Sequence, residues 1–437
     1  MARIAIIGGG YAGMAAAVTL AERGVGVTVF EAGKTLGGRA RRIDYRGSVI
    51  DNGQHILAGA YSELLRLMAV VGVAKSALKR VPLTLSMPPE FRLAARPSAW
   101  LPGPLYLAWM LLCARGLTIA DKFAAVRFMQ ALKRAKFQVD STKTVATLLR
   151  EHRQPQNLID SLWRPLTISA LNTPVETASA QVLANVLRDS LLSTREASDL
   201  LLPMVDLSAL FPAPAAAWLG GHGGEVQLAT RVKSITAISA NDGGYQVETD
   251  AALASFDAVI IAVGPHQLAG LMPQIDAPAL AFEPIVTVYF KFDQAVRLPE
   301  AMFGQASGLA QWFFDRDALG GRGGNEGMVA AVISASGVHE DLHHERLAAG
   351  VLQELTRHLP HCPPPLWQKV IVEKFATFAC TPNAPRPATT TSYAGVFLAG
   401  DYVAGDYPAT LEGAARNGIK AAHACLGHLQ QCGNVHL

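Results

Sequence analysis

The segment RIAIIGGGYAGMAAAVTLAERGVGVTVFE, residues 3–31, decides the fold. Residues 3–7 predict a buried strand, residues 14–24 predict a helix that ends at Gly24, and residues 26–31 predict a second strand. Together these elements make one β-α-β unit of about thirty residues, which is the length that such a unit needs. Strands and helices that alternate in this way predict an α/β protein with a parallel sheet.

The turn between the first strand and the helix carries three glycines at dinucleotide-binding spacing. Gly8, Gly10 and Gly13 fit the pattern G-x-G-x-x-G, and they follow a strand and open a helix as that pattern requires. We expect Gly8 to allow the tight turn, Gly10 to let the backbone approach a pyrophosphate, and Gly13 to let helix and strand pack closely. Glu31 ends the second strand, where a carboxylate binds a ribose hydroxyl. No arginine follows Glu31, so the site favours NAD or FAD over NADP.

The rest of the chain interleaves two kinds of segment. Nucleotide-type elements are predicted again near residues 210–265 and at the C-terminal end, and helices are predicted at 60–75, 121–138, 142–153, 176–202 and 341–358. We therefore expect a discontinuous cofactor domain made of residues 1–80, 210–275 and 390–437. A substrate domain made of residues 81–209 and 276–389 is then inserted into it twice.

Composition narrows the classes of function. Half of the 437 residues are hydrophobic and the net charge is only +3, which gives no case for nucleic acid as a partner. The five cysteines are scattered and no C-x-x-C spacing occurs, so the sequence predicts no metal site and no redox pair. That cysteine pattern fits a reducing compartment, and the N-terminal apolar run is too short for a signal peptide. We expect a cytoplasmic protein.

Three further motifs narrow the choice of cofactor: LGGRAR at 36–41, VFLAGD at 396–401 and TLEGA at 410–414. With the glycine turn, they resemble the amine oxidase and phytoene desaturase superfamily of flavoproteins. The resemblance implies FAD in a Rossmann-type domain with an inserted α+β substrate domain. In that family the arginine lies by the pyrophosphate and flavin, the aspartate holds the ribityl–phosphate region, and the last helix points its positive N-terminus at the flavin pyrimidine ring. The FAD-contact candidates are therefore Gly38, Arg39, Val232, Gly400, Asp401, Glu412 and Gly413.

A narrower resemblance rests on DNGQHIL at 51–57, LWRPL at 162–166, ALNTP at 170–174 and VDLSALFP at 205–212. These segments are similar to the squalene-associated FAD enzymes, the hydroxysqualene dehydroxylases of hopanoid biosynthesis. The implied reaction is reductive removal of an allylic hydroxyl from a long apolar isoprenoid, and it needs an acid for the departing oxygen and a dry apolar pocket. Imidazole titrates near neutral pH, so His55 is the candidate acid, and Gln54 and Asn172 are candidates to orient the hydroxyl. A purely structural role for His55 or Asn172 stays open.

An apolar run at 99–114 is followed by a basic amphipathic segment that extends to residue 138. The run is short for a membrane span and contains prolines, so residues 99–138 predict a surface-lying contact with the inner face of an anionic membrane. The alternative is a buried helix pair. No second glycine fingerprint follows a strand, so the flavin must exchange electrons with its substrate, oxygen or an external donor.

Three alternatives share this fold. A carotenoid desaturase uses the same cofactor and a long apolar substrate but runs the flavin in the oxidative direction. An amine oxidase needs an aromatic cage, for which only Tyr402 and Tyr407 are candidates. A carrier that binds prenyl chains without catalysis is a different class, and the intact set of FAD motifs argues against it.

Overall fold

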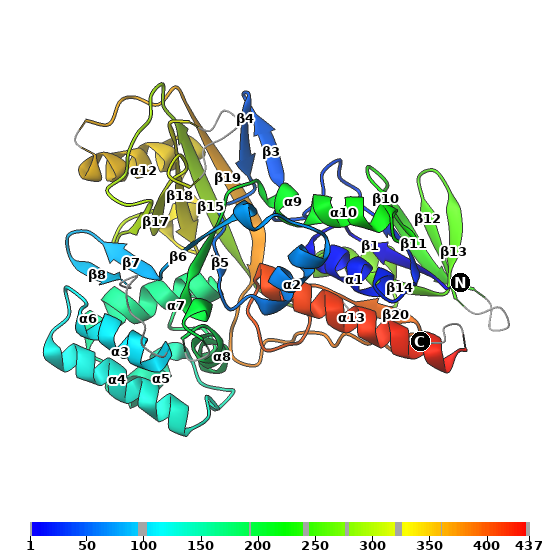
Figure 1. Ribbon diagram of the computed structural model, residues 1–437, viewed down its shortest axis with the longest axis horizontal. Coiled ribbons are helices and arrows are strands. Elements are labelled where there is room, and N and C mark those ends of the chain that lie inside the picture. Colours follow the sequence, from blue (N-terminus) through cyan, green and yellow to red (C-terminus); the bar gives the residue numbers. More distant parts are fainter. Residues whose placement is uncertain are drawn as a thin grey trace.

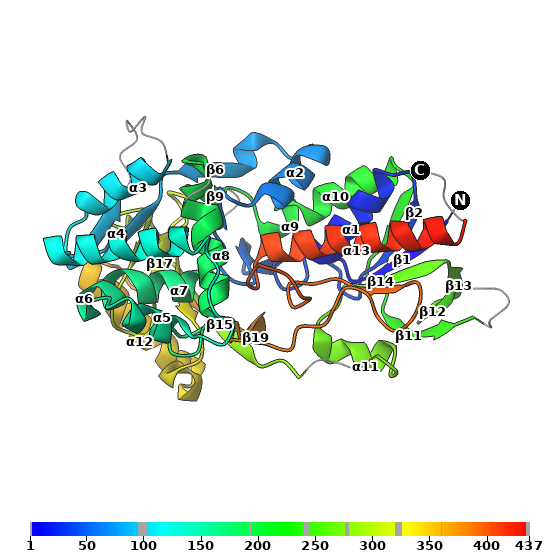
Figure 2. The same ribbon diagram turned by 90° about the horizontal axis from the view of Figure 1, so that it is seen from below.

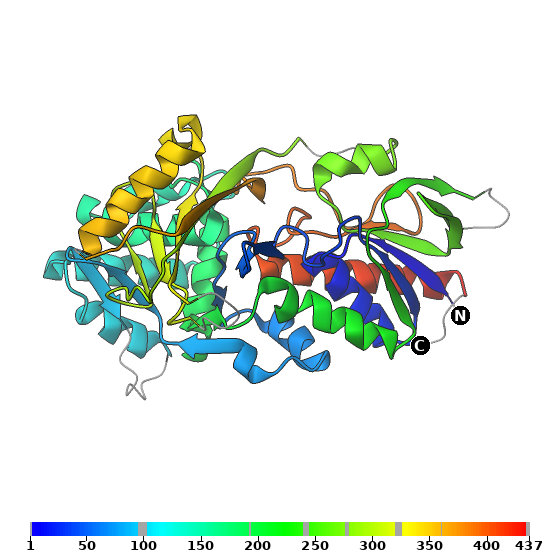
Figure 3. The same cartoon turned by 90° about the horizontal axis from the view of Figure 1, so that it is seen from above.

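The computed structural model describes residues 2–94, 103–191, 194–238, 244–275, 279–319, 326–359 and 361–433. Its elements form two parts at opposite ends of an elongated molecule (Figures 1 and 3). One part is built on a parallel sheet and contains the two ends of the described chain. The other part is built on an antiparallel sheet and contains most of the remaining helices.

The first part confirms the predicted α/β class. Its five-stranded sheet has the order β10-β2-β1-β14-β20, and every neighbouring pair is parallel. The strands come from three distant segments of the chain. They are β1 (Arg3–Ile7), β2 (Gly26–Phe30), β10 (Gly224–Gln227), β14 (Ala258–Ile261) and β20 (Val396–Leu398).

Both faces of the parallel sheet are buried at β1, β14 and β20, which explains the continuous apolar runs of these strands. On β1, Ile4 and Ile6 face the helical layer, and Ala5 and Ile7 face the opposite layer. The helical layer holds α1 (Tyr11–Ala21), α2 (Ser62–Val70), α9 (Leu207–Leu210), α10 (Pro212–Gly220) and α13 (Leu411–Gln431). The opposite layer is a small antiparallel sheet of β11 (Val232–Ala237), β12 (Tyr245–Thr249) and β13 (Leu253–Phe256).

Helices α1 and α13 lie side by side over the sheet (Figures 1 and 2). Gly418 permits this approach, because a Cβ atom at that position would lie 2.2 Å from the carbonyl oxygen of Ala12. Every residue of α1 is buried, so the helix has no solvent face. The N-termini of α1 and α13 are thereby brought to the same edge of the sheet.

The second part is built on an antiparallel sheet with the order β16-β17-β18-β15-β19. Helix α12 (His344–His358) covers one face, and alternate residues of β15 such as Val286 and Val288 pack against it. The strands are β15 (Phe282–Lys291), β16 (Met302–Gly304), β17 (Trp312–Asp315), β18 (Met328–Ser334) and β19 (Trp367–Phe378).

A cluster of helices lies on the side of the antiparallel sheet away from α12 (Figure 1). These helices are α3 (Gly103–Leu112), α4 (Ile119–Arg134), α5 (Val145–Glu151), α6 (Gln156–Leu158), α7 (Arg164–Leu171) and α8 (Ala180–Leu191). Thr118 and Asp121 form a capping box that begins α4. Among the residues described, no helix is long and apolar enough to cross a membrane. Of the predicted membrane segment, residues 99–102 lie outside the described residues.

Short strands form three small antiparallel sheets: β3 (Arg42–Tyr45) with β4 (Ser48–Asp51), β7 (Thr84–Met87) with β8 (Phe91–Ala94), and β5 (Leu57–Ala58) and β6 (Leu78–Val81) on either side of β9 (Leu200–Pro203). Strand β7 contacts β16, and the short helix α11 (Leu268–Leu271) packs against β11. The expected helix at 176–202 is wrong at its end, because Leu200–Pro203 is a strand. That strand lies between β5 and β6, so pairing across long sequence distances overrides the local helical pattern.

Candidate active site

One large cavity of about 1210 Å³ extends from the carboxyl edge of the parallel sheet to the antiparallel sheet. A pocket for one small ligand measures roughly 300–1,000 Å³, so this cavity has room for a cofactor and a substrate together. Its lining comes from β1, the loops after β2, α7, α8, β15, β19 and the start of α13. The parallel sheet thus contributes the edge at which α/β proteins bind their ligands.

The glycine turn lies at one end of the cavity. Gly8 has a φ of +112° and donates its N–H to the carbonyl of Phe30 at 2.8 Å. A Cβ atom on Gly13 would lie 1.9 Å from the oxygen of Gly8, so only glycine fits there. Gly8 and Gly10 line the cavity, whereas Gly13 lies behind the turn at the contact between helix and strand.

Glu31 faces the same end of the cavity. Its carboxylate accepts hydrogen bonds from the N–H groups of Gly9 at 2.8 Å and Gly33 at 2.7 Å. Two backbone donors therefore hold the acidic group at the edge of the sheet. Val232, at the start of β11, lines the cavity nearby.

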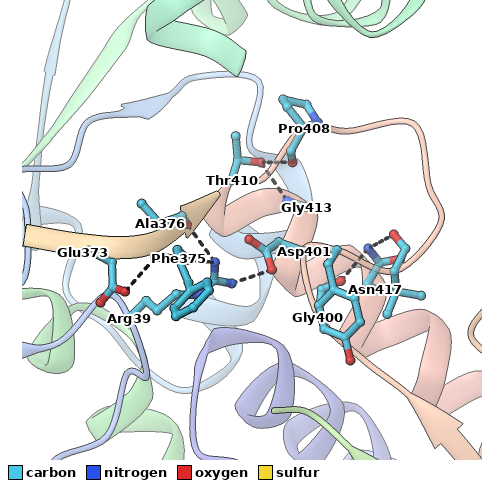
Figure 4. A network of polar contacts seen from close by, with 12 residues as sticks. Arg39, Glu373, Phe375, Ala376, Gly400, Asp401, Pro408, Thr410, Gly413 and Asn417 are labelled. Carbon is cyan, nitrogen blue, oxygen red and sulfur yellow. Dashed lines mark hydrogen bonds and ion pairs between the residues drawn. The ribbon is translucent and has the colours of Figure 1, made fainter. Parts of the chain in front are cut away.

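Arg39 joins three segments at the centre of the site (Figure 4). Its Nη2 lies 2.5 Å from Oδ1 of Asp401, and its Nη1 donates to the carbonyls of Phe375 and Ala376 at 2.9 and 2.7 Å. Gly38, Gly400 and Asp401 line the cavity beside Arg39. The motifs at 36–41 and 396–401 therefore come together at one site. The contact links residues 362 positions apart in the sequence.

Asn52 continues this network toward the substrate end. Its Nδ2 donates to the carbonyl of Arg39 at 2.9 Å and to Oε2 of Glu373 at 3.0 Å. Both Asn52 and Glu373 line the cavity. Sequence reasoning missed Glu373, because it lies in a strand whose local pattern shows nothing unusual.

The start of α13 faces the cavity through Leu411 and Ala414, while Glu412 and Gly413 do not line it. Glu412 is fully buried and accepts hydrogen bonds from the N–H groups of Glu63 and Leu64 at the start of α2. Its carboxylate therefore caps another helix. The N–H of Gly413 donates to Oγ1 of Thr410, which is the N-cap of α13 (Figure 4).

Asp51 is the last residue of β4 and begins a polar loop, residues 51–55, which lies within the DNGQHIL segment. Its Oδ1 accepts the N–H of Leu207 at 2.8 Å, and its Oδ2 lies 3.7 Å from Nη2 of the buried Arg316. Burial raises the pKa of Asp51 to about 6, and the nearby Arg316 opposes that shift without cancelling it. Arg316 also donates from Nη1 to Oε1 of Gln54 at 2.8 Å. Sequence reasoning missed Arg316, because a lone arginine between two aspartates is typical of an exposed turn.

His55 lines the cavity and its Nδ1 lies 2.9 Å from the carbonyl oxygen of Gly53. Since a carbonyl only accepts, Nδ1 carries the hydrogen and Nε2 is the other, available nitrogen. Burial lowers the pKa of His55, and the positive charge of Arg39 lowers it further. The ring is therefore neutral around pH 7.

Asn172 ends α7 with a left-handed φ of 46°. Its Oδ1 accepts the N–H of Ala335 at 2.7 Å, and its Nδ2 donates to Oγ1 of Thr377 at 2.9 Å and to the carbonyl of Pro284 at 3.3 Å. These bonds use the polar atoms of the side chain and tie the helix to the antiparallel sheet. Asn172 lies on the cavity wall but its amide is already occupied.

The end of the cavity farthest from the glycine turn is mostly apolar. Helices α7 and α8 form one side and the antiparallel sheet forms the other. The apolar lining residues there are Leu83, Leu85, Leu166, Val186, Leu187, Ile285, Met302, Trp312, Phe314, Val332 and Ile371. A long hydrocarbon can displace water along such a wall with a gain of about 25 cal/mol for each Å² that it buries.

This fold and site define a flavin-binding oxidoreductase. The family described as flavin containing amine oxidoreductase matches residues 11–426, and the chain belongs to that family. Among solved structures, a putative protoporphyrinogen oxidase from Exiguobacterium sp. 255-15 has a TM-score of 0.70 at 20% identity and covers 98% of this chain and 99% of its own. Putrescine oxidase has a TM-score of 0.69 at 16% identity over 98% of this chain and 99% of its own. These two likenesses concern the fold alone.

Within that family, the chain groups with relatives named hydroxysqualene dehydroxylase, as the sequence resemblance predicts. The relative from Rhodopseudomonas palustris is 30% identical and covers 96% of this chain and 97% of its own. The relative from Zymomonas mobilis is 29% identical over 97% of this chain and 99% of its own. A probable zeta-carotene desaturase from Synechococcus elongatus is 24% identical over 97% of this chain and 98% of its own.

Proposed function

We propose that the protein is an FAD-dependent hydroxysqualene dehydroxylase, which converts hydroxysqualene to squalene and water in hopanoid biosynthesis. The observation that carries the proposal is the cavity itself, which joins a dinucleotide-type end to a long apolar end at a polar loop, residues 51–55. The similarity to full-length relatives of that name supports the same substrate.

FAD suits the cofactor end. Gly8 and Gly10 leave their backbone open to a pyrophosphate, and Glu31 is held where a ribose hydroxyl binds. The family resemblance assigns Arg39 to the pyrophosphate and flavin, Asp401 to the ribityl–phosphate region and the backbone of Val232 to adenine, and all three residues line the cavity. Glu412 and Gly413 act through α13, whose N-terminus they position toward the cavity. The domain division at 1–80, 210–275 and 390–437 follows from the same assignment.

The reaction breaks the carbon–oxygen bond of the substrate. Reduced flavin, when bound, supplies the hydride that the carbon accepts, and the oxygen must leave with one added proton as water. We assign that proton to Nε2 of His55, which faces the cavity when Nδ1 is bonded to Gly53. Because the pKa of His55 is lowered, the protonated ring is scarce at pH 7, and the rate of dehydroxylation should rise as the pH falls.

The other two candidates have different roles. Gln54 reaches the cavity and orients the hydroxyl. Asn172 positions the cavity wall through its bonds to three strands and loops of the antiparallel sheet. The electrons come from an external donor.

One experiment distinguishes this function from that of a desaturase. It tests each of two substrates with the flavin in each of two redox states. Purified protein is given hydroxysqualene or phytoene, with its flavin either chemically reduced or oxidised, and the extracted lipids are identified by mass spectrometry. We expect squalene from hydroxysqualene and reduced protein. New conjugated double bonds in phytoene with oxidised protein would favour the desaturase, and no flavin in the purified protein would favour a carrier.

We also propose that the protein lies on the inner face of the membrane through α3 and α4. Ile119 and Phe123 are 74% and 68% exposed, and Trp109 and Leu112 on the neighbouring helix are 47% and 52% exposed. Exposed basic residues follow along this surface: Arg115, Arg127, Lys133 and Arg134. Apolar side chains beside basic ones suit an interface with anionic lipid. Helix α3 contacts α8, which lines the apolar end of the cavity, so an insoluble substrate has a short route.

The membrane proposal is tested by sedimentation with vesicles that contain anionic or only neutral lipids. Phe123→Ser should weaken binding to anionic vesicles severalfold. Leu253→Ser removes a leucine that is 60% exposed on the parallel-sheet part and serves as the matched control. Equal binding of both variants and the unchanged protein would contradict the assignment of this surface.

A further inference from the structure

The buried residue Arg316 contacts the polar loop from the antiparallel sheet. It directly follows β17, and its side chain is only 9% exposed. Its Nη1 donates to Oε1 of Gln54 at 2.8 Å, and its Nη2 lies 3.7 Å from Asp51. Its Nε has no hydrogen-bond partner among the residues that the structure describes. The shortest polar contact of this buried cation is therefore to an amide rather than to a carboxylate.

That contact determines which end of the Gln54 amide faces Arg316. A guanidinium has only donors, so it must meet the amide oxygen, because two facing N–H groups would repel each other. The Nε2 atom then lies on the other branch of the amide, where it donates one hydrogen to the carbonyl of His55 at 3.2 Å. Within the described parts of the chain, no acceptor binds its second hydrogen. Gln54 lines the cavity, so this hydrogen is available to a ligand.

We propose that Arg316 is a positioning residue that makes Gln54 a hydrogen-bond donor to the hydroxyl oxygen of the substrate. The inference rests on the proposed function and deepens it, since it explains how the site selects an alcohol over a hydrocarbon of the same length. A hydroxyl oxygen has two lone pairs, so it accepts the Gln54 N–H and still accepts a proton from His55. A pure hydrocarbon leaves the Gln54 N–H without a partner, which disfavours its binding.

The test compares two ligands that differ by the hydroxyl. Hydroxysqualene and squalene are titrated from the same detergent micelles into the flavin-loaded protein, and changes in the flavin absorbance give both dissociation constants. We expect the unchanged protein to prefer hydroxysqualene. Gln54→Met keeps a side chain of similar size but removes both the N–H groups and the amide oxygen, so the substrate hydroxyl finds neither a donor nor a strong acceptor there. It should lose about tenfold of that preference, the value of one good hydrogen bond.

Substitutions at Arg316 test the positioning role itself. Arg316→Met should lose a similar factor, whereas Arg316→Lys keeps a donor-only group and should retain most of the preference. Arg297→Met removes a mostly exposed arginine that lies 3.8 Å from Asp315 of the same β17 strand, so it controls for loss of a cation. A merely structural role would change the affinities for both ligands together and leave their ratio unchanged.

The outcomes separate the two claims. If the unchanged protein prefers hydroxysqualene and both Gln54→Met and Arg316→Met keep that preference, the inference is overturned and the proposed function stands. If the unchanged protein binds both ligands equally, the result contradicts both the selection of the hydroxyl by Gln54 and the assignment of hydroxysqualene as the substrate. Gln54→Met tests the role of the Gln54 amide even if Arg316→Met fails to fold.

Discussion

The two ends of the cavity are built in different ways. At the cofactor end, backbone N–H groups and charged side chains bind each other across the glycine turn, Arg39 and Asp401. At the substrate end, strands and helices present apolar side chains, and the polar atoms are few and come from residues 51–55 and their partners. The cofactor end is therefore preorganised by hydrogen bonds, and the substrate end is shaped by packing.

This contrast matches the chemistry of the two ligands. A dinucleotide carries fixed phosphates and hydroxyls that need donors and acceptors at defined places. A long isoprenoid offers mostly apolar surface, so its affinity comes from exclusion of water and its specificity from one or two polar contacts. Changes at the cofactor end should therefore act on folding and flavin binding, and changes at the substrate end on selectivity.

The largest effect is expected at the glycine turn. Gly13→Ala places a Cβ atom 1.9 Å from the oxygen of Gly8, so α1 must move away from the sheet. We expect a loss of about 4 kcal/mol or more in the free energy of unfolding, and no bound flavin. Gly427→Ala in α13 is the control, because a Cβ atom there meets nothing within 4 Å. Equal stability of the two variants in denaturant titrations would refute the close helix–strand contact.

The next effect concerns pH and the polar loop. The folded pKa of Asp51 is raised to about 6, so the folded state holds the proton more tightly than the unfolded chain. The contribution of Asp51 to stability is therefore complete below about pH 4 and is lost as the pH rises through 6, with an amplitude of about 3 kcal/mol.

Asp51→Asn stays neutral at all these pH values. The free energy of unfolding of the variant minus that of the unchanged protein should therefore increase between pH 4 and pH 6.5. Denaturant titrations at several pH values measure this difference. A difference that does not depend on pH would show that Asp51 titrates normally.

A smaller effect is expected where Arg39 binds Asp401. Arg39→Met leaves the buried carboxylate without its cation, and because the arginine is partly exposed we expect a loss of about 2 kcal/mol, or roughly thirtyfold in FAD affinity. Titration of the apoprotein with FAD measures it. Arg42→Met should change FAD affinity little, because neither Arg42 nor its partners Asp44 and Asp206 line the cavity. The same loss in both variants would mean that overall charge attracts the cofactor.

The smallest effect lies at the substrate end. Nε1 of Trp312 donates to Oγ of Ser169 at 3.0 Å, and both residues line the cavity. Ser169→Ala should cost about 1 kcal/mol of stability, the value of an ordinary hydrogen bond, and leave FAD affinity unchanged. Thermal unfolding with and without FAD distinguishes the two effects. A marked loss of FAD affinity would contradict the claim that residues at the substrate end do not contribute to cofactor binding.

Much of the cofactor end could be predicted because its residues form short local motifs. Gly8, Glu31 and Arg39 stand in patterns whose spacing follows from a strand, a turn and a helix. The substrate end could not be predicted in the same way. Arg316 binds Gln54, which is 262 positions away in the sequence, and the residues around Arg316 form no motif that indicates a role in a site. The strand at Leu200–Pro203 departs from the helix that the local pattern predicts for the same reason, since its pairing partners lie far along the chain.

The most direct measurement is a single turnover without oxygen. The flavin of the purified protein is chemically reduced, excess reductant is removed, hydroxysqualene is added, and the flavin absorbance is followed while the lipids are extracted and quantified. Our account predicts that the flavin is reoxidised with one squalene formed for each flavin. A flavin that stays reduced, with no squalene formed, would contradict the proposed dehydroxylation.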